Sequence, residues 1–456
     1  MKSPFTTVFL SSVLAVLSIF TLLFCFYSNG GFLFHAVVAA SEPKVYDPNL
    51  KVEVVAEGLK FPTSMSFLGP NNILVLEKNN GTVRSVINGT LQSKPLLKID
   101  VAVPGEMGLL GIAVAKNQTN MKKTYVFLYY TEYTKDGNDV CQKPSYCEGW
   151  KKPKSNNLYR YELVNNKLVN PKLLLKLPAL QNSYVHNGGS IVIGPDNNIY
   201  IPVGDLNSPT TWASNVEGGL PPEGTGGILR VNLDGQPILN DTLIGNKDPL
   251  DLYYAYGIRN SFGLDFAPVS KKLWDTENGP AFGDEINIVE KGFNSGWKSV
   301  QGIWKAKEYL NGVKGGENLT RYSIFDGADG LVDFNGKGKY SFPEFTWNRT
   351  VGVTSLKFLS SDNLGEQYKN DLFVASYKYG LLYHFDLKID RSGLLLSSPL
   401  DDTVANNNNE IQSMVFGKGF TAPTDLEVGP DGYLYVLNFW DGKLYKIMPN
   451  NITPKY

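Results

Sequence analysis

Histidine and cysteine are both scarce in this chain, which contains three of each among its 456 residues. One of each lies in the first 40 positions, and the others are Cys141, Cys147, His186 and His384. A structural zinc site needs about four Cys or His ligands held together. Because the two histidines lie far from the cysteines and from each other in sequence, the pattern argues against a zinc enzyme and against a catalytic Cys–His pair.

An excess of charge of either sign is missing as well. The chain has 43 Lys and Arg residues against 44 Asp and Glu residues, and only 19% of its residues are charged. A nucleic-acid-binding domain normally has a basic excess or a basic face, so this balance argues against a nucleic-acid partner. Aromatic residues reach 12%, which is too many for a disordered chain.

Three motifs of common enzyme and metal-binding classes are absent. There is no Gly-x-Gly-x-x-Gly segment of a dinucleotide-binding fold, which argues against NAD or FAD. There is no Gly-x-Ser-x-Gly elbow, which argues against an α/β-hydrolase. There is no Asp-x-Asp-x-Asp-Gly loop either, so calcium binding of the EF-hand type is excluded.

Residues 1–40 predict a targeting segment. Lys2 precedes an uncharged apolar run from Phe5 to Phe26, and Val38-Ala39-Ala40 offers the small residues that signal peptidase needs, so we expect cleavage after Ala40. The run is also long enough to span a bilayer, and an uncleaved membrane anchor at residues 5–26 is the alternative. Either way, we expect residues 41–456 to form one domain outside the cytoplasm.

Two further features are typical of an exported chain. Cys141 and Cys147 are spaced for a small loop disulfide in an oxidising compartment. Glycosylation sequons, Asn-x-Ser/Thr, begin at Asn80, Asn88, Asn117, Asn240, Asn318, Asn348 and Asn451. The sequence therefore predicts a secreted or cell-surface glycoprotein.

The pattern after residue 41 is typical of an all-β protein. Short runs rich in β-branched and aromatic residues, such as residues 124–130 and 372–376, are bounded by turn residues. Gly-Pro-Asn/Asp turns that enter an apolar run recur at Gly69, Gly194 and Gly429, with looser copies near Ala267 and Leu359. Such repeated units predict a six-bladed β-propeller with inserted loops near residues 134–157, 205–225 and 300–345. Chance recurrence of these turns in another large β protein is the alternative.

His186 is the candidate base, because it precedes Asn187-Gly188-Gly189, where glycines allow the backbone to approach a ligand closely. Arg259 and Asn260 form a second candidate site, since a guanidinium beside an amide can polarise a carbonyl or bind a carboxylate. Taken singly, each residue is as well explained by a structural role.

The segment from Asn278 to Asn287 is a candidate cation site. It combines a Gly279-Pro280 turn with the carboxylates Asp284 and Glu285. Backbone carbonyls and carboxylates are the oxygen ligands that Ca²⁺ prefers.

Taken together, these segments resemble the soluble quinoprotein glucose/sorbosone dehydrogenase family, which includes aldose sugar dehydrogenases. The resemblance covers residues 50–448 and is carried, in order, by Glu106–Gly111, His186–Gly189, Gly227–Val231, Gly257–Asn260 and Gly279–Trp297, with a looser match at Phe373–Lys378. It implies a six-bladed propeller that binds pyrroloquinoline quinone (PQQ) and Ca²⁺ on its axis, oxidises a sugar and passes electrons to an external acceptor.

The resemblance also implies roles for single residues. His186 is similar to the base that takes the sugar hydroxyl proton, and Arg259 to the residue that polarises the quinone carbonyl. Asn260, Glu106 and Lys378 stand where relatives contact the cofactor, Glu106 replacing a Gln that several relatives have. The resemblance implies that the backbone oxygens of Gly279 and Pro280 bind the Ca²⁺ of the cofactor. It implies that Glu285 binds a second, structural Ca²⁺. Substrate contacts are expected in the inserted loops, with Trp347 as one candidate.

One departure from the family concerns the cofactor's carboxylates. Relatives often carry Arg-x-Arg before the last Gly-Pro-Asp turn, whereas this chain has Ala422 and Thr424 there. A charged hydrogen bond commonly contributes about 1.5–3 kcal/mol, so the change predicts weaker PQQ binding unless another cation substitutes.

Three hypotheses about function follow from these features. The first is an exported PQQ-dependent aldose dehydrogenase. The second is a propeller that has lost catalysis and serves as an extracellular binding module. The third, which rests on the axial calcium and single histidine alone, is a calcium-dependent propeller lactonase or esterase.

Overall fold

The structure is a computed structural model that describes residues 42–116, 123–134, 152–313, 318–322 and 331–450. Pro43–Tyr456 form one compact unit, separate from Met1–Glu42. The leader, Cys141, Cys147 and the sequons at Asn117 and Asn451 lie outside the described residues. Within the described part of the chain, no helix is both long enough and apolar enough to cross a membrane.

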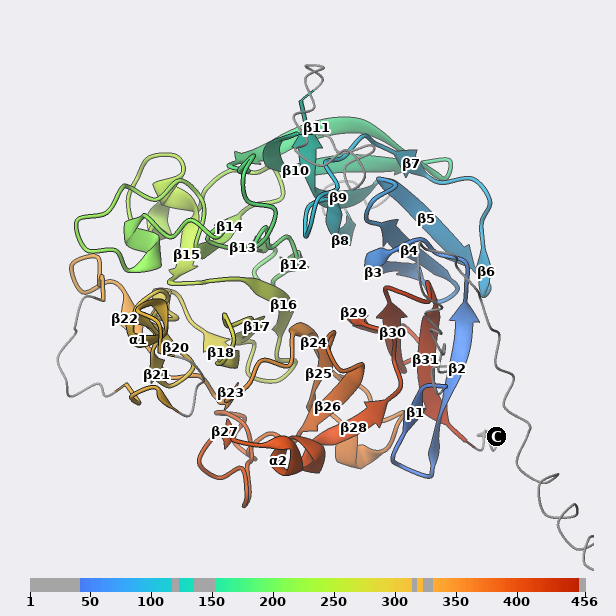
Figure 1. The fold of residues 1–456 in the computed structure, drawn as a ribbon. Helices are drawn as coiled ribbons and strands as arrows, with labels where there is room; N and C mark the ends of the chain where they lie inside the picture. Colours follow the sequence, from blue (N-terminus) through green and yellow to red (C-terminus); the bar gives the residue numbers. More distant parts are fainter. Residues whose placement is uncertain (1–41, 117–122, 135–151, 314–317, 323–330, 451–456) are drawn as a thin grey trace, which may run out of the picture. The chain divides into compact units, whose positions relative to one another are not determined.

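Six sheets of four to six strands follow one another around a ring (Figure 1). The first sheet contains β3 (Pro62–Gly69), β4 (Asn72–Glu77), β5 (Thr82–Ile87), β6 (Thr90–Leu91) and β7 (Leu97–Lys98). The second sheet contains β8 (Leu109–Lys116), β9 (Thr124–Tyr133), β10 (Pro153–Val164) and β11 (Lys167–Leu177). The third sheet contains β12 (Val192–Ile193), β13 (Ile199–Val203), β14 (Gly227–Val231), β15 (Tyr253–Tyr256), β19 (Phe293–Asn294) and β22 (Lys339–Tyr340).

The other three complete the ring. The fourth sheet contains β16 (Ser261–Phe266), β17 (Leu273–Glu277), β18 (Asp284–Val289), β23 (Phe345–Trp347) and β27 (Val404–Ala405). The fifth sheet contains β24 (Val353–Phe358), β25 (Leu372–Ser376), β26 (Leu381–Phe385), β28 (Val415–Lys418) and β1 (Lys44–Val45). The sixth sheet contains β29 (Pro423–Val428), β30 (Leu434–Asn438), β31 (Leu444–Pro449) and β2 (Leu50–Ala56). β1 and β2 pair with strands from the C-terminal part of the chain, so residues 44–56 close the ring. The all-β propeller predicted from the sequence is confirmed.

Short elements decorate this ring. They are the hairpin β20 (Val300–Gln301) and β21 (Trp304–Lys305), the helices α1 (Ala306–Leu310) and α2 (Asn408–Ser413), and 3-10 turns at Trp212–Ser214, Leu239–Asp241, Leu250–Leu252 and Glu366–Tyr368. The inserted segments predicted near residues 205–225 and 300–345 contain several of them.

Two of the recurrent segments, those that begin at Gly194 and Gly429, form the same turn. In the first turn the amide of Gly194 donates to Asn198 O at 2.8 Å, and in the second the amide of Gly429 donates to Tyr433 O at 2.9 Å. In each turn the aspartate accepts a hydrogen bond at 2.8 Å from a tyrosine on the next strand, Asp196 from Tyr200 and Asp431 from Tyr435. The same residues thus connect the first two strands of different sheets, as the repeat predicts.

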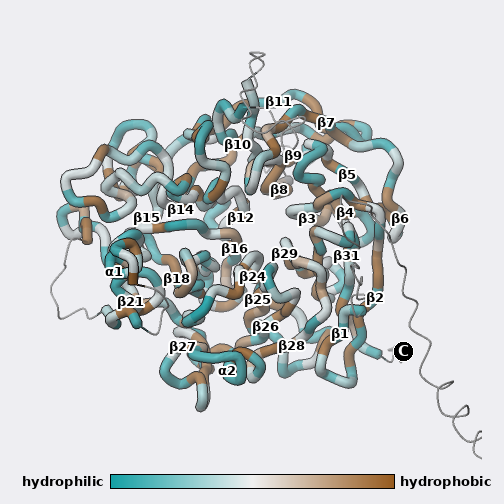
Figure 2. Tube along the Cα trace, viewed as in Figure 1, coloured by the Kyte–Doolittle hydropathy of each residue, from teal (hydrophilic) through white to brown (hydrophobic). Residues whose placement is uncertain are grey.

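The core of the protein lies between neighbouring sheets rather than at the ring's centre. Phe127 and Tyr129 of β9 pack with Ile201 of β13, for example, and Trp274 of β17 packs with Tyr383 of β26. Figure 2 shows hydrophobic segments along strands such as β2, β26 and β28, and a hydrophilic stretch at α2. Because the side chains of each sheet are buried by its neighbours, the loops at the axis are free to carry polar groups.

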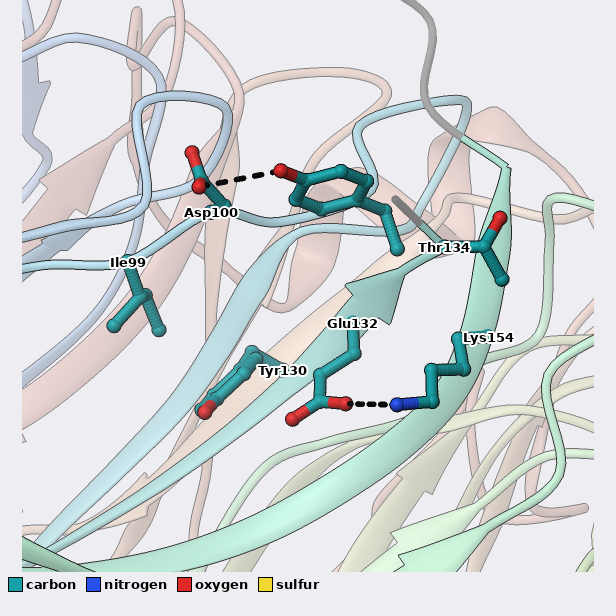
Figure 3. A pocket seen from close by; sticks show the side chains of 7 residues that line it. Ile99, Asp100, Tyr130, Glu132, Thr134 and Lys154 are labelled. Atoms are coloured by element: carbon teal, nitrogen blue, oxygen red, sulfur yellow. Dashed lines mark hydrogen bonds and ion pairs between the residues drawn. The ribbon is translucent and has the colours of Figure 1, made fainter. Parts of the chain in front are cut away.

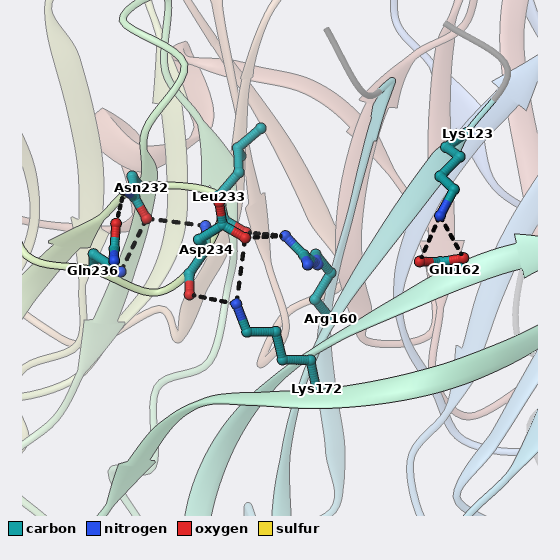
Figure 4. A network of polar contacts seen from close by, with 8 residues as sticks. All are labelled: Lys123, Arg160, Glu162, Lys172, Asn232, Leu233, Asp234 and Gln236. Carbon is teal, nitrogen blue, oxygen red and sulfur yellow. Dashed lines mark hydrogen bonds and ion pairs between the residues drawn. The ribbon is translucent and has the colours of Figure 1, made fainter. Parts of the chain in front are cut away.

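Ion pairs also connect neighbouring sheets. On the outer edge, Arg160 of β10 and Lys172 of β11 both contact Asp234 of the next sheet, at 2.6 and 3.3 Å (Figure 4). Asp234 is 57% exposed, and exposed pairs contribute little.

A more buried tie joins three inner strands. Lys357 of β24 lies 3.3 Å from Asp265 of β16 and 3.0 Å from Glu427 of β29, and its side chain is 17% exposed. Burial lowers the pKa of Lys357, but the two carboxylates outweigh that effect and hold the pKa above its usual value. Lys357 is therefore a charged connection between three successive sheets.

Replacing Lys357 with Met should lower the free energy of unfolding by about 3 kcal/mol, because two largely buried carboxylates would lose their cation. In the control, Lys272→Met removes a 2.9 Å pair with the exposed Glu290, where we expect less than about 1 kcal/mol. Urea unfolding followed by circular dichroism measures both values. Equal losses in the two variants would contradict the structural role given to Lys357.

Candidate functional site

A cavity of about 440 Å³ lies on the axis of the ring. Every one of the six sheets contributes to its wall through an innermost strand or an adjacent loop, including Ser64, Leu110, Ser190, Phe262, Thr354 and Asp425. The volume falls within the range of small-molecule binding sites. The cavity brings together five of the predicted site residues, which are Glu106, His186, Arg259, Asn260 and Gly279.

His186 sits in this wall in an unusual backbone conformation. Its φ is +60°, a left-handed value that bulky residues adopt only at a cost, and its side chain is almost completely buried. Gly189 has φ +111°, and a Cβ there would lie 2.7 Å from the Tyr129 ring. The His-Asn-Gly-Gly segment thus turns tightly against β9, which presents the imidazole to the cavity.

Asp205 holds the His186 ring. Its Oδ1 lies 2.5 Å from His186 Nδ1, and it is 3% exposed. The same carboxylate accepts hydrogen bonds from Trp297 Nε1 at 2.7 Å and from the Asn207 amide at 2.7 Å. A carboxylate so placed fixes the proton on Nδ1, leaving Nε2 as the nitrogen that can accept a proton from a ligand.

Arg259 shares this environment. Its Nη1 donates to Asn278 O at 2.7 Å, its guanidinium lies 5.4 Å from the Trp297 ring centre, and its carbonyl accepts the Asp205 amide at 3.0 Å. Burial lowers the pKa of Arg259, while nearby carboxylates, led by Asp205, oppose that shift. Its Nε is buried and has no hydrogen-bond partner among the described residues.

Glu106 connects the two candidate sites. Its Oε2 accepts the His186 amide at 2.6 Å and Asn260 Nδ2 at 3.3 Å. The Oδ1 atom of Asn260 is buried and has no partner. Glu106 therefore orients both neighbours, whereas Asn260 keeps one acceptor unused.

Lys78 is a cavity residue that the sequence reasoning missed. It follows β4 and is 7% exposed, and its Nζ donates to Asn79 Oδ1 at 3.1 Å and to Val103 O at 3.4 Å. Burial lowers the pKa of Lys78 to about 8, and Glu106 partly offsets this. Asp205 was missed as well. It lies two residues after the buried strand β13, a position that carries no local mark in the sequence.

Gly279 lies in the cavity wall, with Pro280 directly after it, in the predicted cation segment. The Gly279 amide donates to Asp284 Oδ1 at 2.9 Å. The other oxygen of Asp284 accepts the amides of Val351 and Gly352 at 2.7 Å each. Asp284 thus fixes the Gly-Pro turn against the start of β24 and is itself fully used as a structural acceptor.

Glu285 points away from the cavity into a buried group of carboxyls with Glu277 and Asp275. Ser295 Oγ lies within hydrogen-bond distance of both Glu277, at 2.6 Å, and Glu285, at 3.2 Å, and its one hydrogen can be donated to either. Burial raises the pKa of Glu285 to about 8 and of Asp275 to about 7, and burial and the two neighbouring carboxylates raise the pKa of Glu277. Glu277 and Glu285 thus share one hydroxyl group, and carboxylate oxygens of this kind are ligands that Ca²⁺ prefers.

Of three further residues named from the sequence, Thr424 lines the cavity, and Lys378 and Trp347 do not. Lys378 is exposed, with its Nζ 3.0 Å from Thr350 O, and it does not line the cavity. Thr424 lines the cavity, but its hydroxyl donates to Pro62 O at 3.0 Å. Trp347 is completely buried between Phe345 and Tyr383, so the expectation that it contacts substrate is wrong.

A second hollow of about 500 Å³ lies beside β9 and β10, where Tyr130 and Glu132 line it (Figure 3). Its charged groups already pair with one another, Glu132 with Lys154 at 3.6 Å, and Asp100 accepts the Tyr133 hydroxyl at 3.3 Å. It lacks the buried, unused donors and acceptors of the axial cavity, which is therefore the candidate site.

Comparisons with known proteins identify the family of the chain. The glucose/sorbosone dehydrogenase family model matches residues 59–446. The chain is similar to the aldose sugar dehydrogenase of Escherichia coli K12, with 25% identity over 408 residues that cover 88% of this chain and 94% of that protein. It is also similar to quinoprotein glucose dehydrogenase B of Acinetobacter calcoaceticus, with 25% identity and 88% of each chain covered.

Among solved structures, the PQQ-bound aldose sugar dehydrogenase of Streptomyces coelicolor resembles the fold. Its TM-score is 0.57 and its sequence identity 20%, with 88% of this chain and 98% of that chain covered.

Proposed function

The chain belongs to the glucose/sorbosone dehydrogenase family, and on that premise we propose that it is an exported PQQ-dependent dehydrogenase that oxidises the anomeric carbon of an aldose by hydride transfer to PQQ. The observation that carries the proposal is the buried His186–Asp205 pair beside Arg259 in one axial cavity. We also count each of the six sheets as one blade.

The residues of the cavity fit PQQ. Arg259 Nε and Asn260 Oδ1 are buried and unpartnered, and a ligand with carbonyl and ring N–H groups would satisfy both. PQQ carries three carboxylates, and Lys78 and Arg259 are cations in the wall, set against the carboxyls of Glu106 and Asp425. Arg259, Asn260 and Glu106 would hold the cofactor, and the backbone oxygens of Gly279 and Pro280 its Ca²⁺, with Glu285 holding a second ion.

When bound, PQQ supplies a quinone that accepts the hydride, and Ca²⁺ acts on it as a Lewis acid. The chain's own part begins at His186 Nε2, which takes the proton of the sugar C1 hydroxyl as the C1–H bond breaks and the C1–O bond becomes a carbonyl. Asp205 stabilises the imidazolium so formed and keeps Nε2 facing the sugar. The guanidinium of Arg259 would stabilise negative charge that develops on an oxygen of a ligand in the cavity.

Export remains part of the proposal, with residues 1–40 as signal peptide or anchor and Cys141–Cys147 as a disulfide. Four described sequon asparagines, at positions 80, 88, 240 and 318, are exposed and open to glycosylation, whereas Asn348 is 8% exposed and leaves no room for a glycan. The acceptor of the electrons is an external molecule of unassigned identity.

The second candidate function is a non-catalytic extracellular binding module of the same family. Two observations favour it: Ala422 and Thr424 replace the arginine pair of relatives, and Glu106 and Asp425 add negative charge to the cavity. The two functions differ in whether PQQ binds.

Adding PQQ and Ca²⁺ to the purified protein should shift the quinone absorbance and produce dye reduction with glucose or another aldose. The measurement is an absorbance titration with and without Ca²⁺, followed by the dye assay. Failure of both would refute the dehydrogenase, and PQQ affinity weaker than millimolar in a folded protein would support the binding module instead.

Replacing Asp205 with Asn should lower kcat by about 100-fold to 10,000-fold, since the imidazole would lose its fixed tautomer, with little change in PQQ affinity. Asp196→Asn is the matched control, because Asp196 accepts hydrogen bonds in a turn away from the cavity. Stopped-flow reduction of bound PQQ by sugar measures the step. A kcat that D205N leaves unchanged would remove His186 as the base.

Lys78 should supply part of the attraction that the arginine pair gives in relatives. Lys78→Gln should weaken PQQ binding by about tenfold or more, by the usual strength of a charged hydrogen bond. Because the pKa of Lys78 is lowered to about 8, the ammonium loses its proton above that pH, so wild-type affinity should fall as pH rises through 8. The K78Q affinity should lack that fall.

Absorbance titrations at pH 7 and pH 9 at constant Ca²⁺ test this. Lys154→Gln, which alters an exposed lysine of the other hollow, is the control and should keep the wild-type pH dependence. If K78Q binds PQQ as the wild type does at both pH values, Lys78 has no part in cofactor binding.

A further inference from the structure

Three side chains, Asp371, His384 and Asp386, meet on the fifth sheet, and we call them the Asp-His-Asp cluster. Asp371 directly precedes β25, His384 lies in β26 and Asp386 directly follows it, and the two strands are antiparallel neighbours (Figure 1). His384 Nε2 lies 3.2 Å from Asp371 Oδ2 and 3.8 Å from Asp386 Oδ1. Among the described residues, no other group of three His, Cys, Asp or Glu side chains brings its ligand atoms within 4.8 Å of one another.

The Asp-His-Asp cluster is separate from the axial cavity. Asp371 stands at the start of β25, whereas the cavity is lined by Tyr377, directly after the other end of that strand. None of the three side chains of the cluster belongs to the cavity wall. The cluster is therefore no part of the site proposed for PQQ and its Ca²⁺.

Aromatic packing fixes the direction of the His384 ring. Its centre lies 5.0 Å from that of Phe373, 5.1 Å from that of Tyr368 and 6.3 Å from that of Phe416. Its backbone amide donates to Met414 O at 3.0 Å. Because the folded chain already orders this ring, a ligand that binds Nε2 has little side-chain entropy to overcome.

Asp371 is oriented through the oxygen that faces away from His384. Its Oδ1 accepts the Leu387 amide at 3.3 Å and lies 3.6 Å from Arg391 Nη1, whereas its Oδ2 faces the imidazole. Carboxylates that bind a metal ion are themselves commonly held by hydrogen bonds of this kind. Arg391 thus supports the carboxylate from its other side and leaves Oδ2 directed at the cluster.

Two carboxylates face one ring nitrogen in this cluster. Nε2 carries at most one hydrogen, and its separation of 3.8 Å from Asp386 Oδ1 is too long for a hydrogen bond. Partial burial raises the pKa of Asp386, and Asp371 raises it further against the opposing effect of His384. The side chain of Asp386 is 60% exposed, so an ion can reach the cluster from solvent.

We propose that the Asp-His-Asp cluster binds Zn²⁺ through His384 Nε2 and one oxygen each of Asp371 and Asp386. Zn²⁺ holds imidazole and carboxylate ligands at about 2.0–2.2 Å, which places two ligand atoms of a tetrahedron about 3.4 Å apart. The distances of 3.2 and 3.8 Å lie on either side of that value. Nε2 binds through its lone pair, so the ring proton resides on Nδ1, and water fills the fourth position.

The ligand set favours Zn²⁺ over the Ca²⁺ proposed elsewhere in this protein. Ca²⁺ takes six to eight oxygen ligands, whereas an imidazole nitrogen beside two carboxylates is a ligand set that Zn²⁺ accepts. A bound ion would join the start of β25 to the end of β26 and stabilise the folded chain. The proposal does not depend on the proposed function, because the cluster has no part in binding PQQ or sugar.

Calorimetric titration of the purified full chain with Zn²⁺, at saturating Ca²⁺, tests the site. Loss of even an indirect partner of a metal ligand costs about tenfold to 100-fold in affinity, so Asp386→Asn should weaken one Zn²⁺ site at least tenfold. Because Asp386 is exposed, this variant should fold. Asp390→Asn is the matched control, since Asp390 is an exposed aspartate of the same loop that accepts the Ser392 amide. Equal Zn²⁺ binding by wild type and D386N would overturn the proposal.

Histidine NMR identifies the ligand directly. The chain has three histidines, so ¹⁵N-histidine labelling gives three imidazoles, and His384→Gln shows which signals belong to His384. Zn²⁺ should shift Nε2 of His384 in the wild type and in D390N at a concentration that leaves D386N unchanged. A His384 that remains an imidazolium paired with the two aspartates after Zn²⁺ is added would overturn the proposal. The measurement needs neither PQQ nor sugar, so its result stands whether or not the protein is a dehydrogenase.

Discussion

The hydrogen bond between Asp205 and His186 is the contact on which the rest of the site depends. Asp205 accepts from the imidazole, from the indole of Trp297 and from the Asn207 amide, while its own amide donates to the carbonyl of Arg259. The proposed base and the proposed electrophilic cation are therefore positioned by one residue. The indole that donates to Asp205 also stacks on the Arg259 guanidinium, so a shift of the aspartate would move both groups.

The propeller makes this arrangement possible because its sheets stabilise each other pairwise and leave the axis to polar groups. His186 precedes the third sheet, Arg259 the fourth, Lys78 belongs to the first and Asp425 to the sixth. No two of these residues need to be close in sequence, yet the closed ring holds them around one cavity. Polar groups near the axis include buried charges, whose burial is unfavourable. Ion pairs with nearby groups of opposite charge offset this, as between Lys357 and the carboxylates of Asp265 and Glu427.

The fold could be predicted because its signals are local. The Gly194 and Gly429 turns form the same hydrogen bonds, and the turn chemistry that makes them recognisable in sequence also makes them alike in structure. His186, Arg259 and Asn260 could be found because glycines and rare residue types surround them. Asp205 and Lys78 could not, since an aspartate after a strand and a lysine in a loop have no local mark, and their contacts arise only when the ring closes.

The lack of a local signal also explains why the expectation that Trp347 contacts substrate was wrong. Trp347 was assigned to an inserted loop, but it is the last residue of β23, and its alternation with Phe345 turns both rings into the core between two sheets. Lys378 does not line the cavity either, and sequence could not show this, because the direction of a long side chain after a strand depends on partners such as Thr350 that come from another segment.

The charge of Glu106 shows how two departures from the family can belong together. A glutamine at this position could also accept the His186 amide and offer its oxygen to Asn260, so geometry alone does not require a carboxylate. The negative charge instead favours the protonated form of Lys78, whose burial would otherwise lower its pKa further than about 8. With Ala422 and Thr424 in place of an arginine pair, a lysine kept charged at neutral pH is a cation that the cavity can still offer to a carboxylate besides Arg259. Glu106 is thus best understood as the counter-charge of Lys78 rather than as a loss of function.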